Sequence, residues 1–414
     1  MNCSFSFSMV SNKITMEARW FHTLACLGTL ATAAAYAPCG PRRPFCAQLP
    51  RRTLGLASRE ALNDFPAKRL LPLPRARPAR AAAEDEAVAP LPLLHRPLPQ
   101  LILCAAGYGF HVAVLSRRHV ELGALSVGWD TLAGLAVLVG AAARRVRNGR
   151  PALPPWLLGP RSARAEEEAG ALLDLSAAPR KEKLDLLLTG AMLLLAPIFG
   201  AKFLSPVADV VLYALALAGA PLNEARMLSA RLLLEQTALY AACCKLLSAR
   251  HPGFFSRWVR WSARGPWLAP VLGGYAASLA LFNLVEPLNQ ALLPQLGSAT
   301  EGMVAQLASP SDRSAASLLL ASITPCVGAP LYEELQSRAF IFQALTAALP
   351  VRGALALSGL LFGAQHFQLS LVLPLSVTGW FWAVLFVSSR NLLVPVAIHA
   401  LWNARIFVGS YLGL

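Results

Sequence analysis

The chain has 414 residues, of which 56% are hydrophobic and only 14% are charged, and its formal net charge is +15. A soluble domain carries about 25% charged residues, so this composition excludes an ordinary soluble globular protein and indicates an integral membrane protein. Twelve of the 37 Lys and Arg residues stand in the first 83 positions, against three acidic residues. No basic patch interleaved with aromatic residues is present, so we expect no nucleic acid partner.

Residues 1–83 have the features of a targeting presequence. An apolar run over residues 20–37 follows Arg19 and ends in Ala-Tyr-Ala, a pattern typical of signal-peptide cleavage sites. Residues 38–83 are rich in Arg, Ala and Pro and poor in acidic residues, as transit peptides are. The two in succession favour import into a plastid, and we expect the presequence to be disordered. A single transit peptide for a plastid or mitochondrion, or a basic arm, is the alternative.

From about residue 98 the chain is a series of apolar segments. A hydrocarbon core about 30 Å thick is crossed by about 20 helical residues, and backbone polar groups in lipid must be paired within the segment. We therefore expect an all-α, polytopic integral membrane protein with about eight transmembrane helices, since some neighbouring segments must be half-helices or a broken pair. The expected segments are 98–116, 122–143, 184–200, 203–220, 228–248, 268–293, 315–349 (broken), 353–365, 367–388 and 391–411.

Two membrane parts follow the presequence, an amino-terminal set of transmembrane helices over 84–310 and a carboxy-terminal core over 311–414. The first part contains a charged, Pro-rich loop near 144–183. It also carries Arg231 and Glu235, whose i, i+4 spacing predicts a structural ion pair.

Polar residues at helical spacing interrupt the apolar carboxy-terminal core. An ionisable residue at the bilayer centre costs about 2.5–3.5 kcal/mol on insertion scales, so several of them in one bundle point to function. The three motifs are Glu333-Glu334-x-x-x-Arg338, Phe362-x-x-x-His366 and His399-x-x-x-Asn403.

Helical geometry assigns different tasks to the two adjacent acids. Glu334 and Arg338 are four residues apart, which predicts an ion pair on one face. Glu333 is rotated about 100° from Glu334 and is free to act as a general base. Proline is tolerated in the first turn of a helix, so we expect the motif helix to start near Pro330. Both acids would then lie near its amino terminus, where the helix dipole favours negative charge.

The remaining motif residues can complete a hydrolytic site. His399 and Asn403 share a helix face, and His366 lies on another helix. If these helices converge with Glu333, one pocket holds a carboxylate, two imidazoles and an amide. Such a pocket can activate a water molecule and stabilise an oxyanion, which peptide-bond hydrolysis requires.

The ordered series E-E-x-x-x-R, F-x-x-x-H and H-x-x-x-N resembles the CAAX protease and bacteriocin-processing (CPBP, or Abi) family of intramembrane endopeptidases, which includes the type II CAAX prenyl protease. The resemblance covers roughly residues 320–410. It implies that Glu333 with His366 activates the attacking water. It also implies that His399 and Asn403 bind the oxyanion. The substrate it implies is a membrane protein or a lipid-modified peptide.

The other motif residues have supporting tasks under this resemblance. Glu334 and Arg338 would hold the site together, and Phe362 would pack so that it fixes the helix that bears His366. The chain departs from the family pattern at Ser337 and Ala339, where the family often has Phe and Gly. Neither change removes a catalytic group, although both favour a divergent or regulatory member.

The sequence does not favour a metal site. Its eight cysteines form no C-x-x-C pair, and the zinc motif H-E-x-x-H is absent. If zinc were bound, Glu333, His366 and His399 would be its ligands. The resemblance implies water activated by a glutamate, with no required cofactor.

Two other function classes remain open. A non-catalytic membrane scaffold that stabilises a partner protein has no need for Glu333, His366, His399 and Asn403 together. A transporter also fits intramembrane acids and broken helices, but the sequence shows no internal repeat. The joint presence of the four residues favours the endopeptidase.

Overall fold

The computed structural model describes residues 95–122, 125–158, 175, 178–293, 303–310 and 314–412. The chain divides into two units, Met1–Pro90 and Leu91–Leu414, and every described residue belongs to the second. The predicted presequence, 1–83, lies outside the described residues, as does part of the predicted loop near 144–183.

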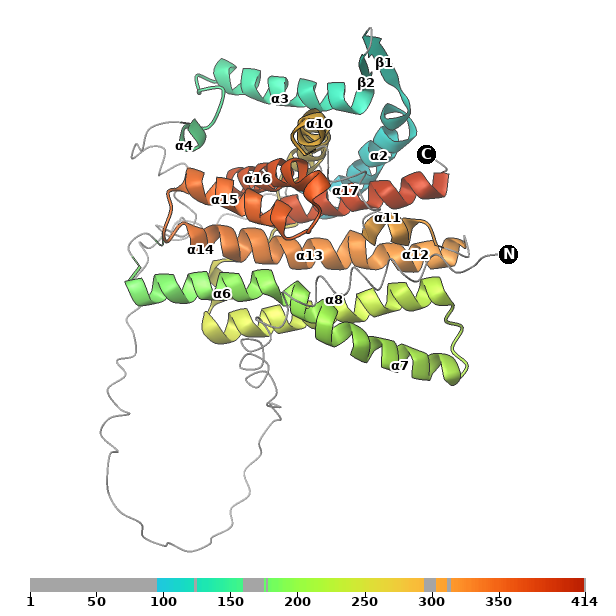
Figure 1. The fold of residues 1–414 in the computed structure, drawn as a ribbon. Coiled ribbons are helices and arrows are strands. Elements are labelled where there is room, and N and C mark those ends of the chain that lie inside the picture. The colour runs from blue at the N-terminus through green and yellow to red at the C-terminus, as the bar shows by residue number, and fades with distance from the viewer. Residues whose placement is uncertain are drawn as a thin grey trace, which may run out of the picture. The chain divides into compact units, whose positions relative to one another are not determined.

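The second unit is built from helices and one short hairpin (Figure 1). Strands β1 (His119–Leu122) and β2 (Leu125–Gly128) pair antiparallel, with Val120 opposite Val127. The helices are α2 (Pro97–Ala113), α3 (Trp129–Arg147), α4 (Pro155–Leu158), α6 (Arg180–Phe199), α7 (Ser205–Leu217), α8 (Glu224–Arg250), α9 (Phe254–Arg257), α10 (Leu268–Leu292), α11 (Met303–Ala308), α12 (Ala315–Ile323), α13 (Ala329–Glu334), α14 (Gln343–Leu345), α15 (Val351–Ala364), α16 (Val372–Ser389) and α17 (Leu393–Leu412). Short 3-10 turns are η2 (Leu115–Arg117) and η7 (Leu369–Leu371), and π-helical turns are η3 (Gly200–Leu204), η5 (Thr324–Gly328) and η6 (Leu335–Phe342). The predicted all-α class is confirmed.

Within the described residues, six helices are long and apolar enough to cross a membrane, and the protein is an integral membrane protein. The sequence predicted about eight crossings, and the described residues do not confirm that number. Helix α15 is apolar but short, and α3 and α8 are not among the six. The six are Pro97–Arg117, Arg180–Leu217, Leu268–Leu292, Ala315–Leu345, Leu369–Ser389 and Leu393–Leu412.

Two expected spans, 184–200 and 203–220, are in fact one continuous helix of 38 residues, Arg180–Leu217. At 1.5 Å per residue it is about 57 Å long, almost twice the thickness of the hydrocarbon core. Pro197 lies inside this helix, and the π turn η3 follows it directly. The helix changes direction there, between α6 and α7 (Figure 1), as expected where a proline removes a backbone hydrogen bond.

The helix that carries the acidic motif is also continuous, over the 31 residues Ala315–Leu345 (Figure 1). The predicted helix start near Pro330 and the predicted break are therefore wrong. The π turn η5 contains Pro325, and Pro330 follows it at the start of α13, yet the helix continues through both prolines. Because Glu333 and Glu334 lie in the middle of this helix, the helix dipole does not explain their position.

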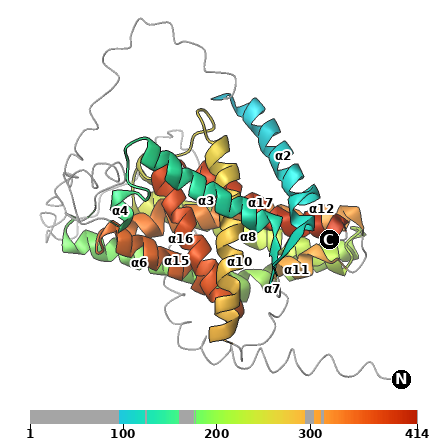
Figure 2. The same ribbon diagram turned by 90° about the horizontal axis from the view of Figure 1, so that it is seen from above.

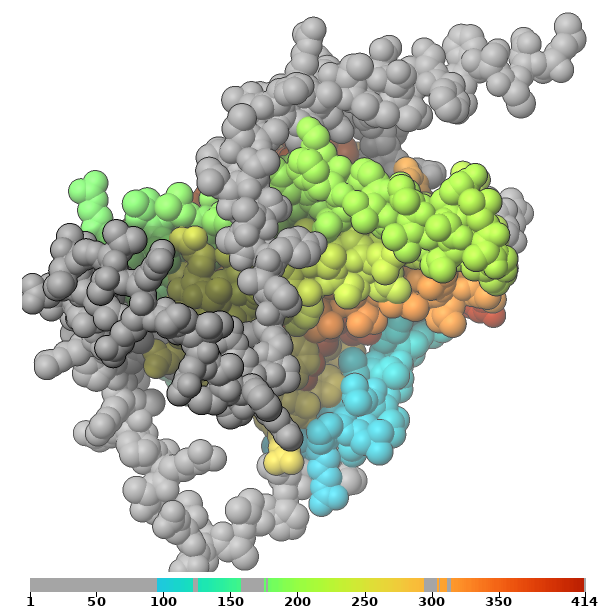
Figure 3. Space-filling model, turned by 90° about the horizontal axis from the view of Figure 1, so that it is seen from below, coloured from blue at the N-terminus to red at the C-terminus, as the bar shows by residue number. Residues whose placement is uncertain are grey.

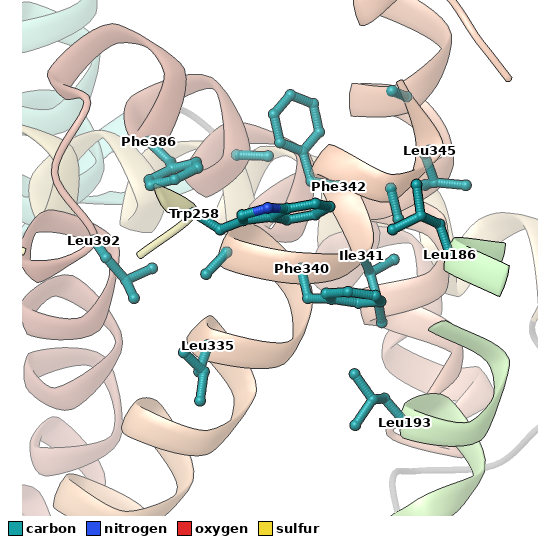
Figure 4. Close-up of a cluster of buried hydrophobic side chains, with 14 of the residues drawn as sticks. Leu186, Leu193, Trp258, Leu335, Phe340, Ile341, Phe342, Leu345, Phe386 and Leu392 are labelled. Carbon is teal, nitrogen blue, oxygen red and sulfur yellow. The ribbon is translucent and has the colours of Figure 1, made fainter. Parts of the chain in front are cut away.

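The motif helix lies at the centre of the bundle. Helices α6 and α8 pack on one side of it and α15 and α17 on the other, while α10 packs against α3, α16 and α17 (Figures 1 and 2). A large apolar cluster surrounds η6, and its aromatic centre is Trp258 stacked on Phe340 with ring centroids 5.4 Å apart (Figure 4). This packing fixes the segment directly after the motif.

Helices α15 and α16 approach closely because glycines face the contact. A methyl group at Gly359 would lie 2.7 Å from the backbone oxygen of Ser376, and one at Gly379 would lie 2.7 Å from the ring of Phe362. Small residues four positions apart, Gly359 and Gly363, are a common means of close packing in membranes. The contact positions the side chain of Phe362 and the carbonyl group of Gly379 beside Arg338.

The outer surface of α7 is strongly apolar. Figure 3 shows α7 and α8 covering one face of the unit. Several large side chains of α7 are more than half exposed, namely Val207, Val210, Tyr213 and Leu217. Such a surface is unusual in water and is expected against lipid.

Substitution of Gly359 by Ala should destabilise the bundle. The added methyl group meets backbone atoms of α16, which cannot move as a flexible side chain can, so we expect a loss of about 1–3 kcal/mol. Gly353→Ala is the matched control on the same helix, because a methyl group there makes only ordinary contacts of 3.5 Å or more. Thermal unfolding in detergent measures both variants, and equal unfolding temperatures would contradict the proposed close approach.

Candidate active site

A buried ionic network lies at the centre of the motif helix. The Arg338 guanidinium is 3.0 Å from both carboxylate oxygens of Glu334, and both side chains are 0% exposed. His399 Nδ1, from α17, lies 3.0 Å from Glu334 Oε1. A carboxylate that pairs with arginine accepts hydrogen bonds only, so Nδ1 carries the proton and donates it. The predicted i, i+4 ion pair is present, and it extends to a third residue.

The guanidinium of Arg338 has further partners besides Glu334. Its second terminal nitrogen donates to the Gly379 carbonyl at 3.0 Å. Its central carbon lies 4.3 Å from the centre of the Phe362 ring and 5.6 Å from that of Trp382. Aromatic faces attract a cation when water is excluded. A buried charge is tolerated only when it is paired and hydrogen-bonded, and this one meets both conditions.

Glu333 is paired differently from Glu334. Its Oε2 lies 3.8 Å from His366 Nε2, and the side chains of Glu333 and His366 are 22% and 28% exposed. His366 Nδ1 lies 2.7 Å from the carbonyl oxygen of Phe362, which can only accept. Nδ1 therefore carries the proton, and in neutral His366 the free lone pair of Nε2 faces Glu333.

Phe362 connects the two groups. Its ring centre lies 4.9 Å from that of His366 and 6.0 Å from that of His399. The same ring covers the Arg338 guanidinium. The π turn η6, the end of α15 and helix α17 thus bring Arg338, His366 and His399 around one aromatic side chain.

Asn403 has a structural partner. Its Nδ2 donates to the Pro325 carbonyl at 2.7 Å. In a π turn a carbonyl is reached by the N–H five residues later, and for Pro325 that residue is Pro330, which has no N–H. The neighbouring N–H of Ala329 donates to Thr324 instead. The amide of Asn403 therefore pairs with a buried carbonyl that the helix leaves unpaired.

A cavity of about 100 Å³ opens beside the Glu333–His366 pair. Sequence reasoning missed four of its polar lining residues, Gln236, Tyr332, Gln336 and Gln365. For two of them the sequence offered a signal, an amide side chain in an apolar segment close to a motif residue. Gln365 directly precedes His366, and Gln336 lies two positions before Arg338.

The three residues named for zinc do not gather around one point. His399 turns its Nδ1 to Glu334, while His366 lies against Glu333. Within the part of the chain that the structure describes, no group of three His, Cys, Asp or Glu side chains is arranged to hold a metal ion. The described side chains therefore do not fit a zinc site.

Residues 315–405 match the family model described as "Type II CAAX prenyl endopeptidase Rce1-like". This segment is an Rce1-like domain. It extends from α12 into α17 and contains every motif residue that the sequence singled out. Searches of curated proteins and of solved structures found no match to the chain.

The Rce1-like domain supports two general conclusions. The family is a family of membrane proteases, which supports a membrane endopeptidase in general. The family also implies a substrate that is a membrane-associated protein. The cavity is not formed by the domain alone, because Pro197 of α6 and Gln236 of α8 line it from outside the matched segment.

Replacement of Arg338 by Leu should destabilise the fold strongly. It leaves the Glu334 carboxylate buried without its cation, which costs about 3–5 kcal/mol. Arg231→Leu is the matched control, because Arg231 pairs with Asp209 at 3.3 Å where the two side chains are 30% and 50% exposed. Such an exposed pair contributes less than about 1 kcal/mol. Chemical unfolding in detergent measures the free energy of unfolding of both variants. Similar losses would contradict the conclusion that Arg338 is important for stability.

Proposed function

We propose that this protein is an intramembrane endopeptidase that hydrolyses a peptide bond of a membrane-associated protein by means of an activated water molecule. The observation that carries the proposal is the Glu333–His366 pair, 3.8 Å apart at the edge of a cavity in a largely apolar bundle. A carboxylate and an imidazole held together with access to a cavity are the groups that general base catalysis requires.

The geometry of the pair suits one water molecule. A distance of 3.8 Å is too long for a direct hydrogen bond, but one water molecule can lie at about 2.8 Å from both atoms. The Glu333 carboxylate and the His366 Nε2 lone pair are both acceptors, so that water donates one proton to each. Its own lone pair is then free to attack the substrate carbonyl carbon.

Hydrolysis proceeds in two steps, and Glu333 carries one proton from the first step to the second. The water oxygen bonds to the carbonyl carbon while Glu333 takes one proton, and the carbonyl oxygen becomes an oxyanion. When the oxyanion collapses, the C–N bond breaks and Glu333 transfers that proton to the leaving nitrogen. The nucleophile is water, so no covalent intermediate with the protein forms.

His399 and Asn403 are proposed to stabilise the oxyanion. His399 Nδ1 is used by Glu334, so Nε2 donates only when the imidazole carries both protons. Because Glu334 already pairs with Arg338, the network then carries one net positive charge, which the oxyanion balances. Asn403 uses one N–H for Pro325 and retains a second for the substrate. The Glu334–Arg338 pair holds the motif helix and α17 in place and takes no part in proton transfer.

The substrate is proposed to be a lipid-modified peptide of the CAAX type or another membrane protein segment. The location is proposed to be a plastid membrane, and this rests on the composition of residues 1–83 alone. Import of the full chain into isolated plastids, with recovery in the carbonate-resistant membrane fraction, tests the location. Import into mitochondria instead would contradict it.

Cleavage by the purified protein in liposomes tests the proposed chemistry. Glu333→Gln and His366→Ala should each lower kcat by about 100-fold to 10,000-fold, because each removes part of the water-activating pair. Glu286→Gln is the matched control, since Glu286 is another acid in an apolar helix and is hydrogen-bonded by Gln290 at 3.2 Å, outside the cavity. It should leave kcat unchanged. The peptide set includes prenylated and unprenylated substrates, and product masses give the cleavage site.

Two results would contradict the proposal. If a zinc chelator abolishes cleavage and added zinc restores it, the metal-free mechanism is wrong. If a folded wild-type protein cleaves no peptide and Glu333→Gln still rescues a deletion strain, the non-catalytic scaffold takes the place of the enzyme.

A further inference from the structure

The cavity beside Glu333 and His366 is lined by polar atoms that the protein itself does not pair. Gln336 Oε1, Gln365 Nε2, Gln236 Nε2 and the Tyr332 hydroxyl are buried and have no hydrogen-bond partner among the described residues. Gln336 is 0% exposed and Tyr332 is 2% exposed. A buried polar atom without a partner costs about 1–3 kcal/mol, so several around one cavity point to a ligand that pairs with them.

We propose that these residues form a binding site for the substrate backbone, in which Gln336 accepts a hydrogen bond from a substrate N–H and Gln365 donates one to a substrate carbonyl. This inference rests on the proposed function, since it assigns the peptide-binding part of the same site. It adds residues that neither the sequence motifs nor the family match assigns.

The orientation of the two amides follows from the backbone. Pro197 has no N–H for the carbonyl of Leu193, four residues earlier, and Gln336 Nε2 lies 3.1 Å from that oxygen. A carbonyl can only accept, so the nitrogen end of Gln336 must face it. The same nitrogen lies 3.4 Å from Gln365, which must therefore present its oxygen there. This leaves Gln336 Oε1 as a free acceptor and Gln365 Nε2 as a free donor.

One acceptor beside one donor complements the backbone of a peptide. An extended peptide offers N–H and C=O groups in alternation, and pairing with both fixes its register. The described lining of the cavity contains no Lys or Arg, so it suits neutral backbone groups better than an anion. Gln236 and Tyr332 supply further hydrogen-bonding groups on the walls formed by α8 and α13.

Hydration is the alternative explanation for the same atoms. A cavity of about 100 Å³ has room for a few water molecules, since each occupies about 30 Å³ in the liquid. Bound water explains polar walls. It does not make the affinity lost with one substrate N–H depend on the presence of one particular glutamine, and this dependence is the coupling that distinguishes the two explanations. The experiment therefore measures that coupling.

The probes are a farnesylated peptide with a CAAX carboxy terminus and an unprenylated transmembrane peptide. Each is also made with single backbone N–H groups near the scissile bond replaced by an ester oxygen. Dissociation constants are measured by fluorescence anisotropy in detergent. At one position the ester should weaken binding to the wild type about tenfold, the size expected for a lost buried hydrogen bond.

We call the weakening of binding by this ester the ester penalty. In Gln336→Leu the ester penalty should fall below about twofold, because the acceptor of the substrate N–H is gone. Gln343→Leu is the matched control. Gln343 is another buried glutamine of the same helix that donates to backbone carbonyls, those of Ala339 and Trp258. It should retain the full penalty. Gln365→Leu leaves the contact between Gln336 and Leu193 intact. It should raise the dissociation constant of the amide peptide about tenfold. This variant tests the proposed binding site if Gln336→Leu does not fold.

The outcomes separate this inference from the proposed function. An ester penalty that is the same in all variants, or no binding of either peptide to the folded protein, overturns the binding site. If the predicted coupling is present and no peptide is cleaved, the binding site stands and the endopeptidase proposal fails.

Discussion

The ionic network of Arg338, Glu334 and His399 is the interaction on which the rest of the structure depends. It joins the motif helix to α17, and the bond from Arg338 to the Gly379 carbonyl joins both to α16. None of these charges can reach water, so the three helices must remain packed to satisfy them. The partly exposed pair, Glu333 and His366, is thereby held at the edge of the cavity, while Glu334 and Arg338 are fully buried.

Backbone hydrogen bonding gives a second constraint, and it leads to the same site. Pro197 and Pro330 each remove an N–H from a helix, which leaves the carbonyl groups of Leu193 and Pro325 without their usual donors. In lipid such groups must find a partner within the protein. The amides of Gln336 and Asn403 provide it, at 3.1 Å and 2.7 Å. Gln336 is thus fixed in position beside the proposed catalytic pair, and Asn403 holds α17 against the motif helix.

Local spacing predicted the parts of this structure that depend on local geometry. The i, i+4 rule identified the Glu334–Arg338 pair, whose partners lie on one helix face. The same rule was wrong for Arg231, which pairs with Asp209 of α7, while Glu235 accepts a hydrogen bond from Ser205. There the neighbouring helix offered closer partners, and no pattern within α8 reveals its neighbour.

Features that depend on several helices together were not predictable. Proline was expected to start the motif helix, but π turns carry the helix through Pro325 and Pro330. The glutamines of the cavity were missed because amides carry no charge and stand out little in an apolar segment. The family resemblance on residues 320–410 was confirmed by the match over 315–405, yet Gln236 and Pro197 reach the cavity from outside that segment.

The central claim is that Glu333 and His366 act together on one water molecule. Measuring kcat for Glu333→Gln, His366→Ala and the double variant tests it most directly. If the two side chains share one water, the double variant should be about as slow as the slower single variant, because either loss already removes the activated nucleophile. Losses that multiply in the double variant would show that the two residues act independently, and would contradict the account.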